Sequence, residues 1–260
     1  MKTIAIATQK GGVGKTTSAL ELAAAFAQED KKVLLVDFDQ QGNLTDYVGA
    51  DGIESQYTVY DVLHDADLMK KAIIGMNLFD FVKSSPELSK ADVEFNNSED
   101  VFLLDDALDK VRKKYDYIII DNGPQRNKLL QMTYVTADYI ISPCDDTEGG
   151  SKGLINVYND VEKMKKTKVP LSSADIIGAI VTRYKGQTTI NKVAISILED
   201  AMKKINKRGF VMYVRDSVKA SEAKYAKISV QEYSPYNNVA MDYRDIAEAI
   251  VKYEKGDKKK

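Results

Sequence analysis

The chain has 260 residues, of which 44% are hydrophobic and 29% charged, and its formal net charge is −2. This composition is typical of a soluble globular protein, and the length suffices for a full core within one α/β domain. Cys144 is the only cysteine and His64 the only histidine, which excludes internal disulfides, a Cys/His zinc cluster and a cysteine-ligated iron–sulfur cluster. His64 stands in a polar helical stretch, so we expect no Ser–His or Cys–His nucleophile pair. No apolar run approaches the roughly 18 residues that a membrane-spanning helix needs.

Short apolar runs alternate with amphipathic stretches, a pattern typical of a mostly parallel sheet flanked by helices. We expect strands at residues 2–7, 32–37, 78–83, 117–121, 139–143, 176–182 and 210–213. We expect helices near residues 15–29, 58–72, 99–114, 125–137, 149–166, 187–206, 217–226 and 239–254, and a surface loop with a short helix at 84–98. The sequence therefore predicts one doubly wound α/β domain over residues 1–254 and a frayed Lys-rich tail at 255–260. No separate helix-turn-helix domain is expected ahead of the first strand.

The first predicted strand runs into a glycine-rich turn, TQKGGVGKTT at residues 8–17, and then into an Ala-rich helix. Strand, turn and helix in this order are the context of a phosphate-binding loop, whose glycines let successive N–H groups point at an anion beside the helix N-terminus. Lys15 can reach the β- and γ-phosphates, and the Thr16 hydroxyl can ligate Mg²⁺. The strict pattern G-x-x-x-x-G-K-[ST] is not met, because Gln9 holds its first position and a second lysine, Lys10, stands at the mouth of the loop.

Four segments carry a specific resemblance. KGGVGKTT at 10–17 is the deviant Walker A motif of the ParA/MinD family, and VLLVDFDQQGNLT at 33–45 resembles the ParA pattern VLLVDxDPQGNxT, with Gln40 replacing Pro. YDYIIID at 115–121 resembles the family's Walker B strand, and VKASEA at 218–223 resembles its late V-R-x-S-E-A segment. The chain thus resembles a short ParA-family ATPase, and the resemblance implies a deviant Walker P-loop NTPase fold with ATP and Mg²⁺ as cofactors.

By this resemblance Lys10, Lys15 and Asp39 form the catalytic set. Asp39 would orient the attacking water, and Lys10 would reach across a dimer interface to the phosphates of the partner subunit. Thr16 would bind magnesium directly, whereas Asp37, Asp39 and Asp121 would support the metal through water. The residues expected to contact the nucleotide are Lys10, Gly11, Gly12, Val13, Gly14, Lys15, Thr16 and Thr17 in the loop, and Thr182, Arg183 and Arg215 around the base.

The chain also departs from the family pattern. The family's D-C-P-P after Walker B is here Asp121-Asn122-Gly123-Pro124, in which Gly123 adds freedom to a segment that is stiff in relatives. The I-P-R-N stretch that helps to wall the adenine aligns with Val214-Arg215-Asp216-Ser217, which lacks the proline. Gln187 takes the place of a basic residue found in relatives, with Lys185 nearby.

Residues 183–227 hold eleven Lys or Arg and four Asp or Glu, a net of +7, whereas the rest of the chain carries −9. This separation of positive and negative charge along the chain predicts one basic surface on an otherwise acidic protein. Lys219 occupies the arginine position of V-R-x-S-E-A, which contacts DNA phosphates in the family. With few aromatic residues interleaved, attraction to the DNA backbone would dominate. The expected DNA-binding residues are Lys185, Lys192, Lys203, Lys207, Lys219, Lys224 and Lys227.

The function favoured by these patterns is that of a ParA-like partition ATPase of the cytoplasm, associated with the nucleoid. ATP would dimerise it, the dimer would bind DNA without sequence preference, and a ParB-like or other centromere-binding protein would stimulate hydrolysis and release. The alternative is a MinD-like positioning ATPase acting on a membrane or a protein cargo. Residues 246–253 are only weakly amphipathic and lack Phe, Leu and Trp, which disfavours a membrane anchor. A sequence-specific repressor would need a further DNA-reading domain.

Overall fold

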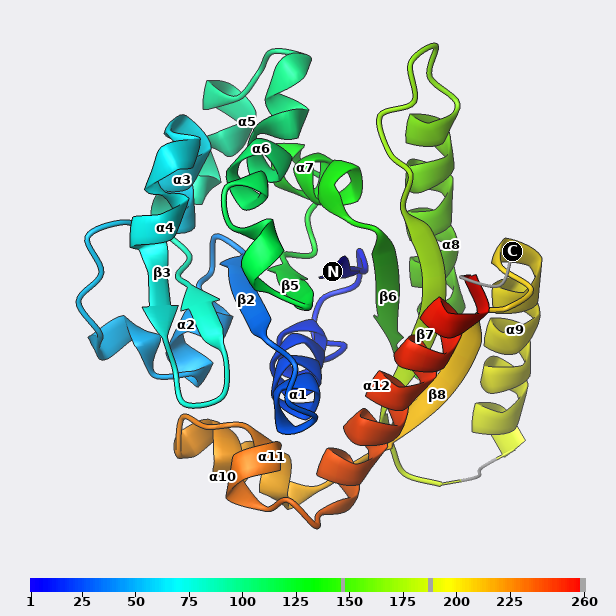
Figure 1. Ribbon diagram of the computed structural model, residues 1–260. Coiled ribbons are helices and arrows are strands. Elements are labelled where there is room, and N and C mark those ends of the chain that lie inside the picture. The colour runs from blue at the N-terminus through cyan, green and yellow to red at the C-terminus, as the bar shows by residue number, and fades with distance from the viewer. Residues whose placement is uncertain (146–147, 187–188, 258–260) are drawn as a thin grey trace.

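A computed structural model describes residues 1–145, 148–186 and 189–257 (Figure 1). Eight strands form one sheet in the order β3-β4-β2-β5-β1-β6-β7-β8, and every neighbouring pair is parallel except β3 with β4. The strands are β1 (Lys2–Ile6), β2 (Val33–Phe38), β3 (Ile73–Gly75), β4 (Asp80–Val82), β5 (Tyr117–Asn122), β6 (Tyr139–Cys144), β7 (Asp175–Tyr184) and β8 (Phe210–Arg215).

Helices cover both faces of this sheet (Figure 1). The longer ones are α1 (Lys15–Gln28), α6 (Leu103–Asp109), α7 (Lys128–Thr136), α8 (Glu148–Lys165), α9 (Thr189–Ile205), α10 (Val218–Tyr225) and α12 (Asn238–Asp257). The short ones are α2 (Asn43–Tyr47), α3 (Val59–His64), α4 (Met69–Ala72), α5 (Ala91–Glu94) and α11 (Val230–Tyr233). Tight 3-10 turns lie at η1 (Ala50–Gly52), η2 (Ala66–Leu68), η3 (Pro86–Lys90), η4 (Glu99–Phe102) and η5 (Arg112–Lys114).

Alternation along the strands divides the core between the two faces. Ile4 and Ile6 of β1 pack with α1 and α12 in one hydrophobic cluster, whereas Ala5 packs with α7 and α8 in another. A third cluster joins β2 and β5 to α3, α6 and α7. Helices on both faces of a mainly parallel sheet confirm the predicted doubly wound α/β fold.

Several predicted boundaries are wrong. The helix expected at 58–72 is broken at Asp65, whose side chain accepts the backbone N–H of Asp67 at 3.0 Å and starts a 3-10 turn. The helix expected at 99–114 is likewise flanked by η4 and η5. The edge strand β3 and the helices α2 and α11 were not predicted, because segments of three to five residues have no periodicity that can be read.

The C-terminal helix is longer than expected. α12 continues to Asp257, into the segment predicted to fray from residue 255 onward, while Lys258–Lys260 lie outside the described residues. Arg208 donates to the carbonyl oxygen of Tyr253 at 2.6 Å and lies over its ring, which holds the last turns in place. The apolar face of α12, with Tyr243, Ile246 and Ile250, is buried in the cluster that contains α1. Among the described helices, none combines the length and apolar character that crossing a bilayer requires.

Candidate nucleotide site

The loop between β1 and α1 lies at the carboxyl edge of the sheet, where parallel α/β sheets bind ligands. Gly12 and Gly14 have positive φ angles of 73° and 81°, a region that residues with a Cβ rarely adopt. Thr182 Oγ1, at the end of β7, lies 3.0 Å from the carbonyl oxygen of Val13 and 3.3 Å from that of Cys144. The hydroxyl of Thr182, a residue expected to contact a base, therefore binds the backbone of the phosphate loop at Val13.

Lys15 is almost fully buried at the start of α1, with 7% of its surface exposed. Burial lowers the pKa of Lys15, while the nearby charges of Asp121 and Asp39 raise it. Its Nζ donates to the carbonyl oxygen of Lys10 at 3.1 Å. The structure thus brings Lys15, Asp39 and Asp121 together around the loop, as the sequence predicts.

Asp121 is the last residue but one of the buried strand β5, in register with Asp37 on β2. Both carboxylate oxygens of Asp121 are buried and, within the described part of the chain, lack a hydrogen-bond partner. Burial raises the pKa of Asp121 well above its usual range and the charge of Asp37 adds to this, whereas the Thr16 hydroxyl and Lys15 lower it. A buried carboxylate with unsatisfied oxygens beside a threonine hydroxyl fits the oxygen-rich, partly hydrated surroundings that Mg²⁺ prefers.

Asp37 has a different environment. One of its oxygens accepts the backbone N–H and the hydroxyl of Thr45 at 2.8 and 2.7 Å, and the other accepts the N–H of Asp39 at 3.2 Å. Burial raises the pKa of Asp37 to about 6, although these hydrogen bonds oppose the shift. Asp37 therefore holds the loop between β2 and α2 in shape, and support of a metal through water remains a prediction for this residue.

Asp39 lies in that loop with 8% of its surface exposed, and its Oδ1 accepts the N–H of Gln41 at 3.1 Å. Gly123, in the segment after β5, faces this carboxylate so closely that a Cβ on residue 123 would lie 2.9 Å from Asp39 Oδ1. Gly123 does not have a positive φ angle. The sequence-based explanation of Gly123 as a source of freedom is therefore incomplete, because this position needs glycine for close approach to Asp39.

Lys10 forms an ion pair within its own chain. Its Nζ contacts Asp145 Oδ2, just beyond β6, and the two side chains are 38% and 29% exposed. The predicted reach of Lys10 to a partner subunit would require this ion pair to open.

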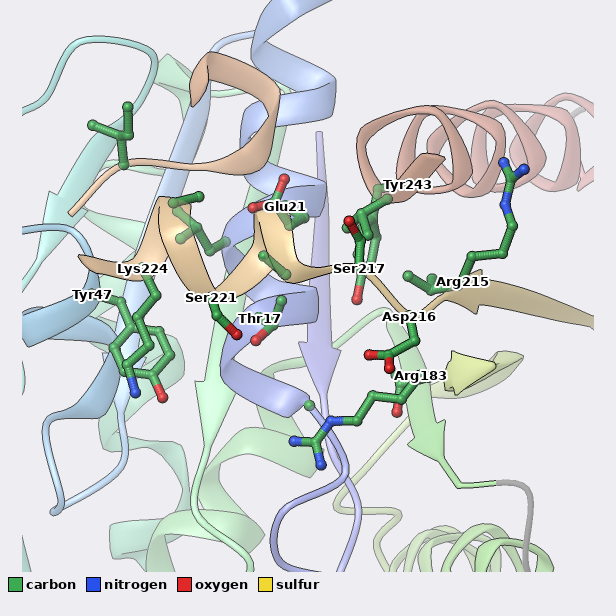
Figure 2. A pocket seen from close by; sticks show the side chains of 18 residues that line it. Thr17, Glu21, Tyr47, Arg183, Arg215, Asp216, Ser217, Ser221, Lys224 and Tyr243 are labelled. Carbon is green, nitrogen blue, oxygen red and sulfur yellow. The ribbon is translucent and has the colours of Figure 1, made fainter. Parts of the chain in front are cut away.

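A cavity of about 270 Å³ extends from the phosphate loop between α1, α10 and the carboxyl ends of β7 and β8 (Figure 2). Thr182, Arg183 and Arg215 all border it, and their contact with a base remains a prediction. The Arg215 guanidinium, however, extends toward α12 and pairs with Asp242, with Nε 3.1 and 3.0 Å from the two carboxylate oxygens (Figure 2). Arg183 is exposed at the cavity, with a positive φ angle of 53°.

The sequence did not reveal the other walls of this cavity. Thr17 and Glu21 line it from one face of α1, a spacing of four residues that a helical wheel would have shown. Glu21 is buried and accepts the backbone N–H of Val230 at 2.7 Å, which ties α1 to α11. Lys224 Nζ lies 4.0 Å from the ring centre of Tyr47, and this pair from α10 and α2 forms one side of the cavity (Figure 2).

The predicted DNA-binding lysines do not form one surface. α9 connects the parallel strands β7 and β8, so it runs back toward the amino edge and places Lys203 and Lys207 there, whereas α10 follows the carboxyl end of β8. Most of these lysines also have partners: Lys185 with Asp216 at 3.3 Å, Lys203 with Asp200 at 3.9 Å, Lys219 with Glu222 at 2.7 Å, Lys224 with Tyr47, and Lys227 with Asp46 and Asp51 at 3.2 and 3.1 Å. Lys192 is exposed on α9, and Gln187 lies outside the described residues.

The chain is similar to known proteins over most of its length. A family model described as "AAA domain" matches residues 1–173. The chain is 32% identical over 256 residues to the sporulation initiation inhibitor protein Soj of Bacillus subtilis, covering 96% of this chain and 98% of that protein. It is 33% identical to the chromosome-partitioning ATPase Soj of Treponema pallidum, covering 96% and 97%. An ATP complex of McdA from Cyanothece superposes with a TM-score of 0.85 at 25% identity, covering 96% of both chains.

The matches to these proteins extend over nearly the whole chain, and the family model spans the strand, glycine loop and helix that build the phosphate site. The chain belongs to the ParA/Soj family of P-loop positioning ATPases.

Proposed function

We propose that this protein hydrolyses ATP to ADP and phosphate in a magnesium-dependent reaction. ATP binding forms a homodimer that binds DNA, and hydrolysis releases it. The observation that carries the proposal is the grouping of Lys15, Asp39 and the unsatisfied carboxylate of Asp121 around one glycine loop. Phosphoryl transfer needs charge neutralisation and an oriented water more than covalent chemistry, and these groups supply both.

Each residue has a separate task in this reaction. The loop amides and Lys15 hold the phosphates, while Asp39 orients the attacking water from its position beside Gly123. Thr16 would hold the magnesium ion directly and Asp121 would hold it through water, and the ion supplies neutralisation of the charge on the phosphate oxygens.

The ion pair of Lys10 with Asp145 suggests how nucleotide binding is linked to dimerisation. A γ-phosphate bound in the partner subunit offers Lys10 a more highly charged acceptor than Asp145, so the lysine exchanges one for the other as two subunits meet. Hydrolysis removes that acceptor and returns the equilibrium to the monomer. The DNA contacts of the dimer are assigned to lysines near the carboxyl edge, including the half-buried Lys219, which pairs with its neighbour Glu222 on α10 and lies over the ring of Tyr233.

The test is binding to an arbitrary-sequence DNA duplex with no nucleotide, with ADP and with ATP, at two salt concentrations. We expect binding that requires ATP and weakens with salt. Asp39→Ala should retain ATP binding, stall turnover and stay on DNA, whereas Lys219→Ala should weaken DNA binding with unchanged basal hydrolysis. If no nucleotide state binds DNA, the DNA switch is refuted, and liposomes and protein partners are the next ligands to try.

A further inference from the structure

A second basic surface, which the sequence did not indicate, lies at the amino edge of the sheet. Lys31 and Lys32 precede β2, Lys114 precedes β5, and Lys70 belongs to α4 beside the edge strand β3. All four are exposed and line one groove of about 350 Å³. The phosphate loop follows the carboxyl end of β1, so the sheet separates the groove from the nucleotide site by roughly one strand length, about 20 Å.

Most of the predicted DNA-binding lysines have a partner, whereas these four have no direct partner among the residues that the structure describes. Within the described ranges, none of the four ammonium groups makes an ion pair or a hydrogen bond. The carboxylate of Asp80, which also lines the groove, accepts the hydroxyl of Tyr115 at 2.7 Å. The acids at the rim are likewise engaged, since Asp67 pairs with Lys110 at 2.7 Å and Asp116 accepts the N–H of Lys32 at 2.9 Å. The groove therefore holds four lysines against one carboxylate in a chain whose net charge is −2.

The walls of the groove are apolar. Ile73, Met76 and Leu78 of the β3–β4 hairpin are partly buried there, and Phe79 lies behind them with 7% of its surface exposed. Apolar walls add nothing to the binding of a phosphate backbone, whose contacts are with charged and polar groups. Apolar walls do favour the burial of an apolar side chain from a ligand. A concave site with apolar walls and a charged rim is typical of peptide and ligand recognition.

We propose that this amino-edge groove binds an acidic peptide segment of a partner protein, with an apolar side chain in the groove and carboxylates on Lys31, Lys32, Lys70 and Lys114. Lysine side chains around such a groove complement acidic residues that flank an apolar anchor. Because the groove and the phosphate loop lie on opposite edges of the sheet, peptide binding does not require nucleotide to leave. The proposal stands whether or not the protein binds DNA.

The test uses a short fluorescein-labelled peptide in which Glu alternates with Leu and Phe, and a matched peptide with Gln in place of Glu. Binding is followed by anisotropy and by the NMR signal of the Met76 methyl group in protein labelled at its methionine methyls. We expect the acidic peptide to bind, to shift the Met76 signal, and to bind more weakly at high salt. The double variant Lys70→Glu/Lys114→Glu should weaken binding by roughly tenfold, because it turns two attractions into repulsions at the rim.

The control variant Lys168→Glu/Lys204→Glu changes the net charge equally, at exposed lysines in the loop after α8 and on α9. Three results would overturn the proposal: no binding of the acidic peptide, equal binding of the Gln peptide, or equal weakening by the control variant. Displacement of the peptide by a DNA duplex together with a Met76 shift would instead identify the groove as a nucleic-acid surface, and would also refute the proposal.

Discussion

Gly123→Ala tests how closely the segment after β5 must approach Asp39. A Cβ at residue 123 would lie 2.9 Å from Asp39 Oδ1 and 3.2 Å from its Cγ, whereas ordinary contacts begin at 3.4 Å. The carboxylate must therefore retreat by about half an ångström, and it does so against its hydrogen bond from Gln41. Since a misplacement of 1 Å can cost a factor of about 100 in rate, we expect turnover to fall by roughly tenfold.

The assay for this variant is steady-state ATP hydrolysis, combined with ATP affinity measured separately by titration. Gly52→Ala is the matched control, because a Cβ at residue 52 meets no atom within 4 Å and its φ angle is not positive. We expect unchanged ATP affinity and reduced turnover for Gly123→Ala, and no change in either quantity for Gly52→Ala. Wild-type turnover in Gly123→Ala would show that the position of Asp39 does not limit hydrolysis. A parallel loss of affinity would show that the segment serves binding instead.

Three further predictions concern the walls of the nucleotide cavity. Burial raises the pKa of Glu21 from 4.5 to about 8, so between these values the folded chain keeps a proton that the unfolded chain has released. The free energy of unfolding should therefore fall as pH rises through this window, and melting curves of Glu21→Gln should show a smaller fall. Tyr47→Leu should weaken ATP binding severalfold, in line with about 1 kcal/mol for an aromatic contact with the base. The binding of tripolyphosphate, which has no base, should stay unchanged. An equal loss of affinity for both ligands would show that Tyr47 does not contact the base. Arg215→Ala should lower stability to urea by about 1–3 kcal/mol, because Asp242 loses its guanidinium partner, and should leave ATP affinity unchanged. A large loss of ATP affinity would instead support the predicted contact of Arg215 with the base.

The amino-acid sequence by itself determined the fold class and the phosphate end of the site. The residues of TQKGGVGKTT are contiguous, and their function depends on local backbone conformation and on the helix that follows, which neighbouring residues control. Asp39 and Asp121 could be predicted because parallel strands deliver their carboxyl ends to one edge of the sheet. The alternation of apolar runs and amphipathic stretches predicted the layers for the same reason, since each face of a sheet must be covered.

Only the tertiary structure decided which partners these side chains have. The engagement of Asp37 by Thr45, the ion pair of Arg215 with Asp242 and the position of Tyr47 against Lys224 all join residues from different elements. The basic surface shows the same limit: a charge count along the chain pointed to residues 183–227, but most of the lysines proposed there are paired with acids or, for Lys224, with a tyrosine ring. The lysines that line the amino-edge groove, which have no direct partner within the described ranges, come from three separate segments, 31–32, 70 and 114. The net charge of a segment is a simple sum over its residues. The electrostatic field at a surface depends instead on which charges the fold places side by side, and packing decides that.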